Sequence, residues 1–546
     1  MSVHPIQFPG EPKEQELPPT TVSQATSVAD LTGSEKQEKQ KVPLDDLFGD
    51  GDDDAVDRVY HAKARILNQA IQEIGFGRYQ AYLFCCAGFG WFADSVWPLI
   101  TGLILTPVVA EFNFDGPFLS LAANIGLFVG ALFWALGCDI WGRRWSFNLT
   151  LLITGIFGLA AGGSNSFITL ASLVAVLGVG VGGNMPVDSA VFLDFVPSTH
   201  QYLLTVMAVW WSLGQLFVSL IAWPLITNFS CDNTAVVCSR SENMGWRYLL
   251  FILGAITLLL WGIRFFVFKL FESPRYLVGL GQDAKAVEVI HQVAEFNGTS
   301  TNLTVDQLLD AAKIEDEKAT AAVTLAKIAS GKEQSGRRWL SQSSSLGLQN
   351  VKALFKTRKM ALSTSLLILL WGIIGLASTL YNSFLPFLLN SRGNAFGDGS
   401  LYITYRNQFI LSVVGIPGAF LSGWAVELPY IGRRGTLAIS SGEQGSQVPF
   451  FSRLPPREAL MLCWGGIIMY GVLYAVSPEV FPAKYRGTGN GLTATATRVF
   501  SIMAPIIALY ANLETAVPVY VSGGMIIGCG FLALLLPYEP RGKASI

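Results

Sequence analysis

The segment GCDIWGRRW, residues 137–145, follows a long apolar run, and a related segment, VELPYIGRRG, follows another run at residues 426–435. A second pair of landmarks keeps a similar spacing: DFVP stands at 194–197 and EVFP at 479–482. The two arginine pairs are 290 residues apart and the two acidic corners are 285 residues apart. An offset that stays nearly constant over two landmarks indicates an internal repeat, so the chain is predicted to consist of two related halves.

The apolar runs between these landmarks predict the fold class. Hydrophobic residues make up 51% of the 546-residue chain and charged residues only 14%, whereas soluble domains contain about 25% charged residues. A run of about 20 apolar residues is long enough to cross a bilayer as a helix. Eleven such runs are found, at 79–108, 117–138, 145–163, 167–190, 202–226, 246–270, 360–389, 404–427, 459–477, 487–511 and 516–537. The sequence therefore predicts an all-α polytopic membrane protein.

Polar segments divide the chain into parts. Residues 1–57 combine low hydrophobicity with a block of acidic residues, a composition typical of disorder, and residues 272–359 separate the sixth apolar run from the seventh. We expect the following order: a disordered acidic cytosolic tail at 1–57, an N-terminal six-helix half at 58–271, a cytosolic linker at 272–359, a C-terminal half at 360–538 and a cytosolic C-terminus at 539–546.

Lysine and arginine beside the run ends predict the orientation. They gather before the first and seventh runs and after the second and eighth, which places the N-terminus in the cytosol. The loop after the fifth run then faces outward, and it contains a glycosylation sequon at Asn228 together with Cys231 and Cys238. A glycosylated asparagine and a small disulfide loop are expected there; a chance sequon and two free thiols are the alternative. The plasma membrane is the expected location of this multi-pass integral protein.

The segment that follows the second arginine pair conflicts with this pattern. A twelfth crossing is needed there, since eleven crossings would place Lys484 and Arg486 outside. Yet residues 436–458 contain four charged residues and paired prolines. A charge at mid-bilayer costs ~2.5–3.5 kcal/mol, and proline removes helix hydrogen bonds. We expect a defective helix in this slot, caused either by a misread exon boundary or shifted frame, or by a genuine loss.

Several motifs resemble a known family. GCDIWGRRW, FESPRYL (271–277) and SPEVFPAKYRGTGNG (477–491) resemble the signature loops of the major facilitator superfamily, close to its sugar-porter branch. The segments at 75–96 and 178–197 are similar to the branch that contains the synaptic-vesicle-glycoprotein-like transporters and their fungal relatives. The resemblance implies a twelve-helix major facilitator fold in two six-helix halves, with alternating access around a central site. It also places the defective segment at helix nine.

The resemblance further implies a cytosolic gate of charged side chains. A carboxylate and a guanidinium group that face each other across the two halves would form a latch, which breaks when the cytosolic side opens. The alternative is that these charges are solvated or only fix the topology. The expected gate residues are Asp139, Arg143, Arg144, Glu272, Arg275, Arg433, Arg434, Glu479 and Arg486.

Two acidic residues within the apolar runs are candidates for proton coupling. Asp94 lies in the middle of the first run and Asp188 near the end of the fourth. Ionisable residues at membrane depth are costly and tend to line pathways, and burial favours the neutral form of a carboxyl group. Either residue could therefore take up and release a proton; a structural hydrogen bond is the alternative for Asp94. Arg498, in another run, could neutralise either acid or bind an anionic solute.

A sugar-like solute needs neutral hydrogen-bonding groups beside aromatic faces. Trp211 and Gln215 in the fifth run and Tyr381 and Asn382 in the seventh supply both, and with Arg498 they form the expected solute site. Gln215 matches a glutamine of the sugar porters, so the resemblance implies contact with the ligand. Packing or interfacial placement is the alternative for the tryptophan.

The sequence favours proton-coupled symport of a sugar or similar small polar metabolite. The alternatives are an organic-anion or phosphate carrier, and a nontransporting nutrient sensor or inactive transporter-like protein. Asn184 stands where proton-coupled phosphate carriers have an acid, which counts against phosphate. The expected partners are a small solute, protons and the lipid bilayer; we expect a monomer with no nucleic-acid partner, cofactor, metal site or enzymatic activity.

Sequencing the transcript tests the prediction about helix nine. If the gene boundaries are misread, the transcript will encode an apolar replacement of about 20 residues or more at 436–458. A transcript that encodes this segment as written would instead indicate a damaged carrier.

Overall fold

A computed structural model describes residues 55–231, 238–313, 351–352, 354–395, 401–426, 428, 431–450, 464–481, 486–510 and 517–537. These residues all belong to one structural unit, residues 47–546. Their secondary structure is helical, with short turns between the helices.

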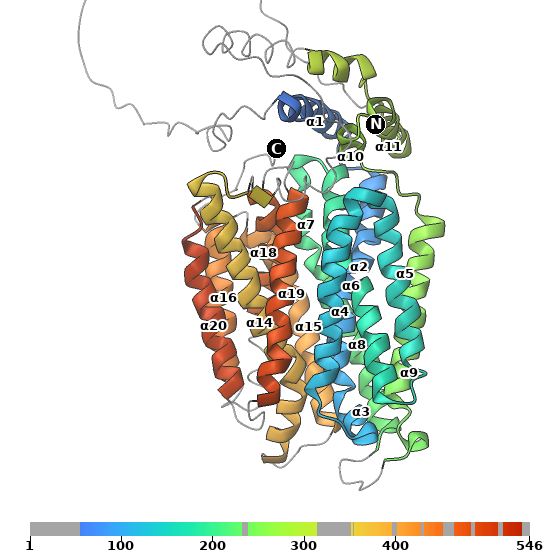
Figure 1. Ribbon diagram of the computed structural model, residues 1–546, viewed down its shortest axis with the longest axis vertical. Coiled ribbons are helices and arrows are strands. Elements are labelled where there is room, and N and C mark those ends of the chain that lie inside the picture. Colours follow the sequence, from blue (N-terminus) through green and yellow to red (C-terminus); the bar gives the residue numbers. More distant parts are fainter. Residues whose placement is uncertain are drawn as a thin grey trace, which may run out of the picture. The chain divides into compact units, whose positions relative to one another are not determined.

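The N-terminal half contains six long helices, drawn from blue to green in Figure 1. They are α2 (Arg78–Leu103), α4 (Pro117–Trp141), α5 (Arg143–Ala161), α6 (Phe167–Phe195), α8 (Ala208–Phe229, preceded by α7, Leu203–Val206) and α9 (Gly245–Gly262, continued by the π-turn η4, Ile263–Val267). The short helix α3 (Leu105–Phe112) follows α2. Within this half α6 packs against α4, α5 and α2, and α9 packs against α5.

The C-terminal half contains six more helices among the described residues, drawn from yellow to red in Figure 1. They are α14 (Arg358–Ala395), α15 (Leu401–Ala425), α16 (Gly432–Phe450), α18 (Trp464–Val480), α19 (Arg486–Tyr510) and α20 (Val517–Leu534). The halves meet where α15 packs against α8, α19 against α4 and α14 against α2. The predicted twelve-helix, all-α fold is confirmed; seven of the described helices are long and apolar enough to span a membrane by themselves.

Glycines allow α4 and α6 to pack closely. A Cβ atom on Gly178 of α6 would lie 2.8 Å from the Ala123 carbonyl oxygen and 2.9 Å from the Leu127 nitrogen of α4. Any larger residue would therefore push the two backbones apart. Lipid is as apolar as a leucine side chain, so the hydrophobic effect does not drive membrane helices together. They associate through close van der Waals packing, which small residues allow.

The slot of helix nine is occupied by α16, which packs against α20 and α18. A Cβ on Gly445 of α16 would lie 2.7 Å from the carbonyl oxygen of Gly523 in α20. Its 19 residues span about 28 Å at 1.5 Å per residue. The polar sequence of residues 432–450 is thus helical and packed between its neighbours. The paired prolines and three of the four charged residues lie outside the described residues. That the segment is defective stays a prediction.

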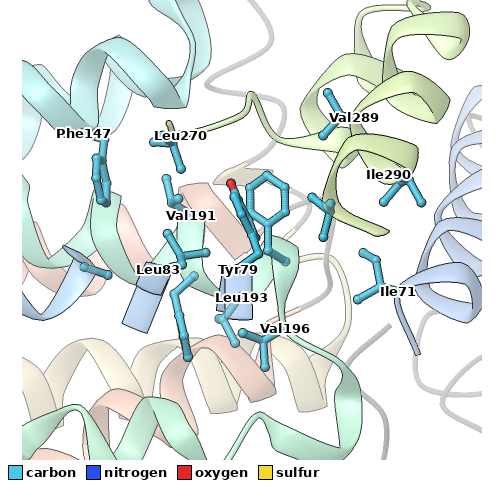
Figure 2. Packing of buried hydrophobic residues seen from close by; sticks show 14 of the residues in the cluster. Ile71, Tyr79, Leu83, Phe147, Val191, Leu193, Val196, Leu270, Val289 and Ile290 are labelled. Atoms are coloured by element: carbon cyan, nitrogen blue, oxygen red, sulfur yellow. The ribbon is translucent and has the colours of Figure 1, made fainter. Parts of the chain in front are cut away.

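Three helices beside the bundle define what we call its linker end: α1 (Ala55–Ile74), α10 (Pro274–Gly279) and α11 (Asp283–Asn297). Lys63 Nζ of α1 forms an ion pair with Asp283 Oδ2 of α11 at 2.5 Å. Asn297 Oδ1 accepts a hydrogen bond from the Tyr79 backbone N–H at 2.9 Å, which ties α11 to the start of α2. Figure 2 shows Tyr79, Ile71 and Ile290 in one apolar cluster, to which α2, α1 and α11 all contribute side chains.

We call the opposite end of the bundle the disulfide end. The C-terminus of α8 and the N-terminus of α9 lie there. Cys231 and Cys238 are joined there by a disulfide. Asn228 is exposed at the end of α8, and its side chain donates a hydrogen bond to the Pro224 carbonyl at 2.9 Å. Glycosylation of Asn228 stays a prediction.

A buried ion pair also joins α3 and α9 at the disulfide end. Arg247 of α9 donates from Nη2 to Glu111 Oε1 of α3 at 2.6 Å, and both side chains are almost fully buried. Asn243 and Trp246 donate to the same carboxylate at 3.0 and 3.1 Å. Burial raises the pKa of Glu111, but the hydrogen bonds and the positive charge of Arg247 outweigh burial and hold it below its usual value.

Replacement of this carboxylate tests the role of the pair. Glu111→Gln should lower the melting temperature, because loss of one partner from a buried ion pair costs about 3–5 kcal/mol. Folding lowers the pKa of Glu111, so its carboxylate contributes fully to the free energy of unfolding above about pH 4.3, the pKa of an unperturbed glutamate. This contribution is lost as the pH falls through the pKa of Glu111 in the folded protein. The variant should therefore lose less stability in acid than the wild type.

Glu295→Gln, at an exposed position of α11, is the matched control and should melt like the wild type. Equal melting temperatures for Glu111→Gln and this control would contradict a stabilising role for the pair.

Candidate solute and proton site

A cavity lies between the two halves and encloses about 540 Å³ of empty space, part of it open to solvent. Its walls come from α6 of the N-terminal half and from α14, α18 and α19 of the C-terminal half. The lining residues are Gly182, Met185, Pro186, Ser189, Trp371, Tyr474, Ser477, Asn490, Thr493, Ala494, Thr497 and Arg498.

One wall of the cavity is aromatic and held in place. Trp371 Nε1 donates a hydrogen bond to Ser477 Oγ at 2.6 Å, which fixes the indole ring. Tyr474 packs edge-on against Trp371, with ring centroids 4.5 Å apart. It also lies tilted against Trp91 of α2, at 5.1 Å between centroids. Because these rings support one another, the cavity presents a rigid apolar face beside its hydroxyl and amide groups.

Arg498 and Asp94 approach each other across the interface between the halves. Arg498 Nη2 of α19 lies 4.0 Å from Asp94 Oδ2 of α2. At this distance the two groups form an ion pair but no hydrogen bond. Asp94 is 1% exposed and Arg498 18% exposed. Arg498 therefore lines the cavity while Asp94 lies behind it.

Asp188 lies in a different environment. Its Oδ1 accepts a hydrogen bond from Arg264 of η4, and neither side chain is accessible to solvent. The Arg264 guanidinium also packs over the ring of Phe147 of α5. Asp188 is not among the cavity-lining residues. Arg264 pairs with Asp188, whereas Arg498 pairs with Asp94, so the two predicted proton-coupling acids have different cationic partners.

Two of the other predicted solute-binding residues, Trp211 and Gln215, lie away from the described wall of this cavity. Trp211 of α8 stacks on Tyr470, with ring centroids 6.1 Å apart, and Gln215 is half-buried. Neither is among the lining residues. Tyr381 and Asn382 belong to α14, but their side chains lie outside the described residues.

A charged network occupies the linker end of the N-terminal half. Arg143 forms an ion pair with Asp194 at the end of α6, and Arg275 Nη1 lies 3.7 Å from the same carboxylate. Glu272 Oε1 accepts from the Arg143 backbone N–H at 3.0 Å, and Oε2 from that of Arg144 at 3.4 Å. Glu272 thus neutralises the positive end of the α5 helix dipole.

Three of the predicted gate residues have a contact within their own half. Arg143 and Arg275 share Asp194, and Arg434 donates to the Leu534 carbonyl of α20. Arg433 is buried. The side chains of Asp139, Glu479 and Arg486 lie outside the described residues. The predicted latch between the halves stays a prediction.

The halves meet near both ends of the bundle: α7 packs against α15 and α18 nearer the linker end, and polar and aromatic contacts join the halves toward the disulfide end. Tyr405 of α15 donates a hydrogen bond to the Leu103 carbonyl of α2, and Ser219 of α8 lies 3.2 Å from Ser412 of α15, hydroxyl to hydroxyl. Trp223 packs on Tyr402 with ring centroids 5.2 Å apart. The cavity-lining residues lie in the half of each helix nearer the linker end, so these contacts lie on the side of the cavity that faces the disulfide end.

Two six-helix halves around a charged central cavity define a secondary membrane transporter. Residues 81–477 match the family model of the Major Facilitator Superfamily. The chain belongs to this family and is a multi-pass integral membrane protein.

The chain is 64% identical over 508 residues to the MFS siderochrome iron transporter 1 of Ceriporiopsis subvermispora (strain B), covering 92% of this chain and 94% of that relative. It is 23% identical over 452 residues to the niacin transporter NiaP of Acinetobacter baylyi, covering 81% and 89%. The solved structure of the proton:xylose symporter XylE has the same fold, with a TM-score of 0.61, 16% identity and coverage of 86% and 98%. Relatives named synaptic vesicle 2-related protein confirm the predicted branch.

Several residues of the site were not predicted. Trp371, Tyr474 and Ser477 are of types that occur throughout apolar helices, so nothing in the sequence distinguished them. Arg264 did carry a signal, because a cation within an apolar run is costly unless it is paired.

Removal of Asp194 tests the charged network. Asp194→Asn should lower the melting temperature by an amount that corresponds to about 3 kcal/mol, because Arg143 and Arg275 lose a buried counter-charge. Asp310→Asn is the control, since the Asp310–Lys313 pair is exposed and such pairs contribute little. If both variants melt like the wild type, the network does not stabilise this end of the bundle.

Proposed function

We propose that the protein is a proton-coupled symporter of a small organic anion, and that it works by alternating access of its two halves. The observation that carries this proposal is the loose ion pair between Asp94 and Arg498 across the interface. It places a carboxylate, which can take up a proton, beside a permanent cation that faces the cavity.

The pair supplies a way to couple the proton to the solute. While Asp94 is ionised, it neutralises Arg498. When Asp94 is protonated, the guanidinium group loses its counter-charge and can bind a carboxylate in the cavity, to which it can donate two parallel hydrogen bonds. Proton and anion then bind cooperatively, and both are carried when the halves rock about the site.

The cavity wall favours a planar anion. The faces of Trp371 and Tyr474 can stack on a flat ring, while Asn490, Thr493 and Thr497 offer hydrogen bonds around its edge. The similarity to the niacin transporter NiaP, whose name describes a pyridine carboxylate, supports this substrate class.

A sugar or similar neutral solute is the second candidate, favoured by the hydroxyl and amide groups of the cavity and by the structural likeness to the proton:xylose symporter XylE. The relative named siderochrome iron transporter adds ferric siderochromes as a third probe. We further propose that the linker end is cytosolic, that its charged network forms part of the gate, and that the protein acts as a monomer in the plasma membrane.

Uptake into proteoliposomes tests the proposal. Purified protein would be reconstituted, an inward proton gradient imposed, and the uptake of labelled nicotinate compared with that of nicotinamide, xylose and a ferric siderochrome. Nicotinamide has the same ring without the negative charge, so it is the matched solute control. The proposal predicts gradient-driven accumulation of nicotinate that a protonophore abolishes, with little uptake of nicotinamide.

Variants then assign the two roles. Arg498→Gln should raise the KM for nicotinate about 10-fold or more, because a charge-assisted hydrogen bond is lost. Asp94→Asn should abolish accumulation against a gradient. Coupled uptake that survives Asp94→Asn would show that Asp94 is not the proton carrier, and accumulation of xylose or the siderochrome in place of nicotinate would overturn the anion proposal.

A further inference from the structure

The ion pair between Asp188 and Arg264 is sealed within the N-terminal half. Both side chains are inaccessible to solvent. Arg264 points into the bundle from the π-turn η4, whereas its neighbours Phe266 and Val267 are 75% and 77% exposed. A buried ion pair contributes little stability compared with apolar residues of similar volume. Ionisable residues at membrane depth are rare and often mark proton or solute pathways, so this pair is a candidate for a role beside Asp94.

Asp188 lies against the part of α2 that carries Asp94. A Cβ on Gly90, one helical turn before Asp94, would collide with Asp188 Oδ2, and it would lie 3.4 Å from the Cβ of Asn184. Asn184 is fully buried, and its side-chain amide lies within reach of the Asp94 carboxylate. Asp94, Asn184 and Asp188 thus form one buried polar cluster between α2 and α6.

We propose that Asp188 and Arg264 form a fixed ion pair, whose two charges cancel beside Asp94. Asp94 is then the group of this cluster that exchanges the proton. Arg264 and Asp188 are positioning residues in this scheme, because they act on Asp94 and do not contact the solute. The inference rests on the proposed proton uptake by Asp94 but not on the identity of the solute.

The described groups around Asp94 support this division. Arg498 faces it from α19, Tyr474 approaches from α18, and Asp188 interacts with it electrostatically from α6. Arg264 lies beyond Asp188 and also interacts with Cys86 of α2. An unpaired Asp188 carboxylate would compete with Asp94 for protons and for Arg498. The guanidinium of Arg264 prevents this, because arginine stays charged even when buried.

Infrared difference spectroscopy of the purified full-length protein tests the inference, since it detects the carbonyl band of a protonated carboxyl group without any solute. The Asp94 band is assigned by its loss in Asp94→Asn. In Asp188→Asn the charge of Arg264 is no longer neutralised, so the Asp94 band should titrate about one pH unit lower or more. In the double variant Asp188→Asn/Arg264→Gln, the titration should return to that of the wild type.

Arg264→Gln provides a second measurement. Either the Asp94 band titrates at higher pH, or a second band appears from a protonated Asp188 and vanishes in the double variant. Asp310→Asn, at an exposed position, is the control and should shift nothing.

A folded Asp188→Asn variant in which the Asp94 band titrates as in the wild type would overturn the inference. If Asp188→Asn does not fold, an Arg264→Gln variant without a shift or a second band would overturn it equally. Absence of any titrating Asp94 band in the wild type would instead contradict the proton step of the proposed function.

Discussion

An ionisable group among apolar helices must be neutralised, and this constraint organises the middle of the bundle. Four such groups form two ion pairs, Asp94 with Arg498 and Asp188 with Arg264. The first pair joins the two halves and borders the cavity, whereas the second is sealed within one half. Because the pairs differ in access, we assign them different tasks: the accessible pair exchanges partners with a proton and a solute, and the sealed pair holds the local charge constant.

The fold could be predicted because its signals are local in the sequence. The repeated GRR segments and acidic corners revealed two halves, and the length of the apolar runs indicated spanning helices. Asp94 and Arg498 stood out for the same reason, since a charge within an apolar run is costly and easily recognised. The polar segment after Arg434 was also located correctly as the slot of helix nine, where α16 packs against its neighbours.

The composition of the cavity could not be predicted in the same way. Which residues line it depends on how α6, α14, α18 and α19 are rotated about their axes, and Trp371, Tyr474 and Ser477 are of common types for apolar helices. Trp211 was a reasonable candidate by residue type, yet its ring stacks on Tyr470 outside the cavity wall. The partner of Asp188 was missed because Arg264, near the end of a run, resembles a charge that only fixes the orientation.

In the proposed mechanism, a proton on Asp94 releases Arg498 to bind an anion. Calorimetry of nicotinate binding, carried out in two buffers with different ionisation enthalpies, measures the protons taken up on binding. At a pH where Asp94 is ionised, the wild type should take up about one proton per nicotinate, since proton and anion bind cooperatively. Asp94→Asn should take up none. Nicotinate binding to the wild type without proton uptake, or equal uptake by the variant, would contradict the claim.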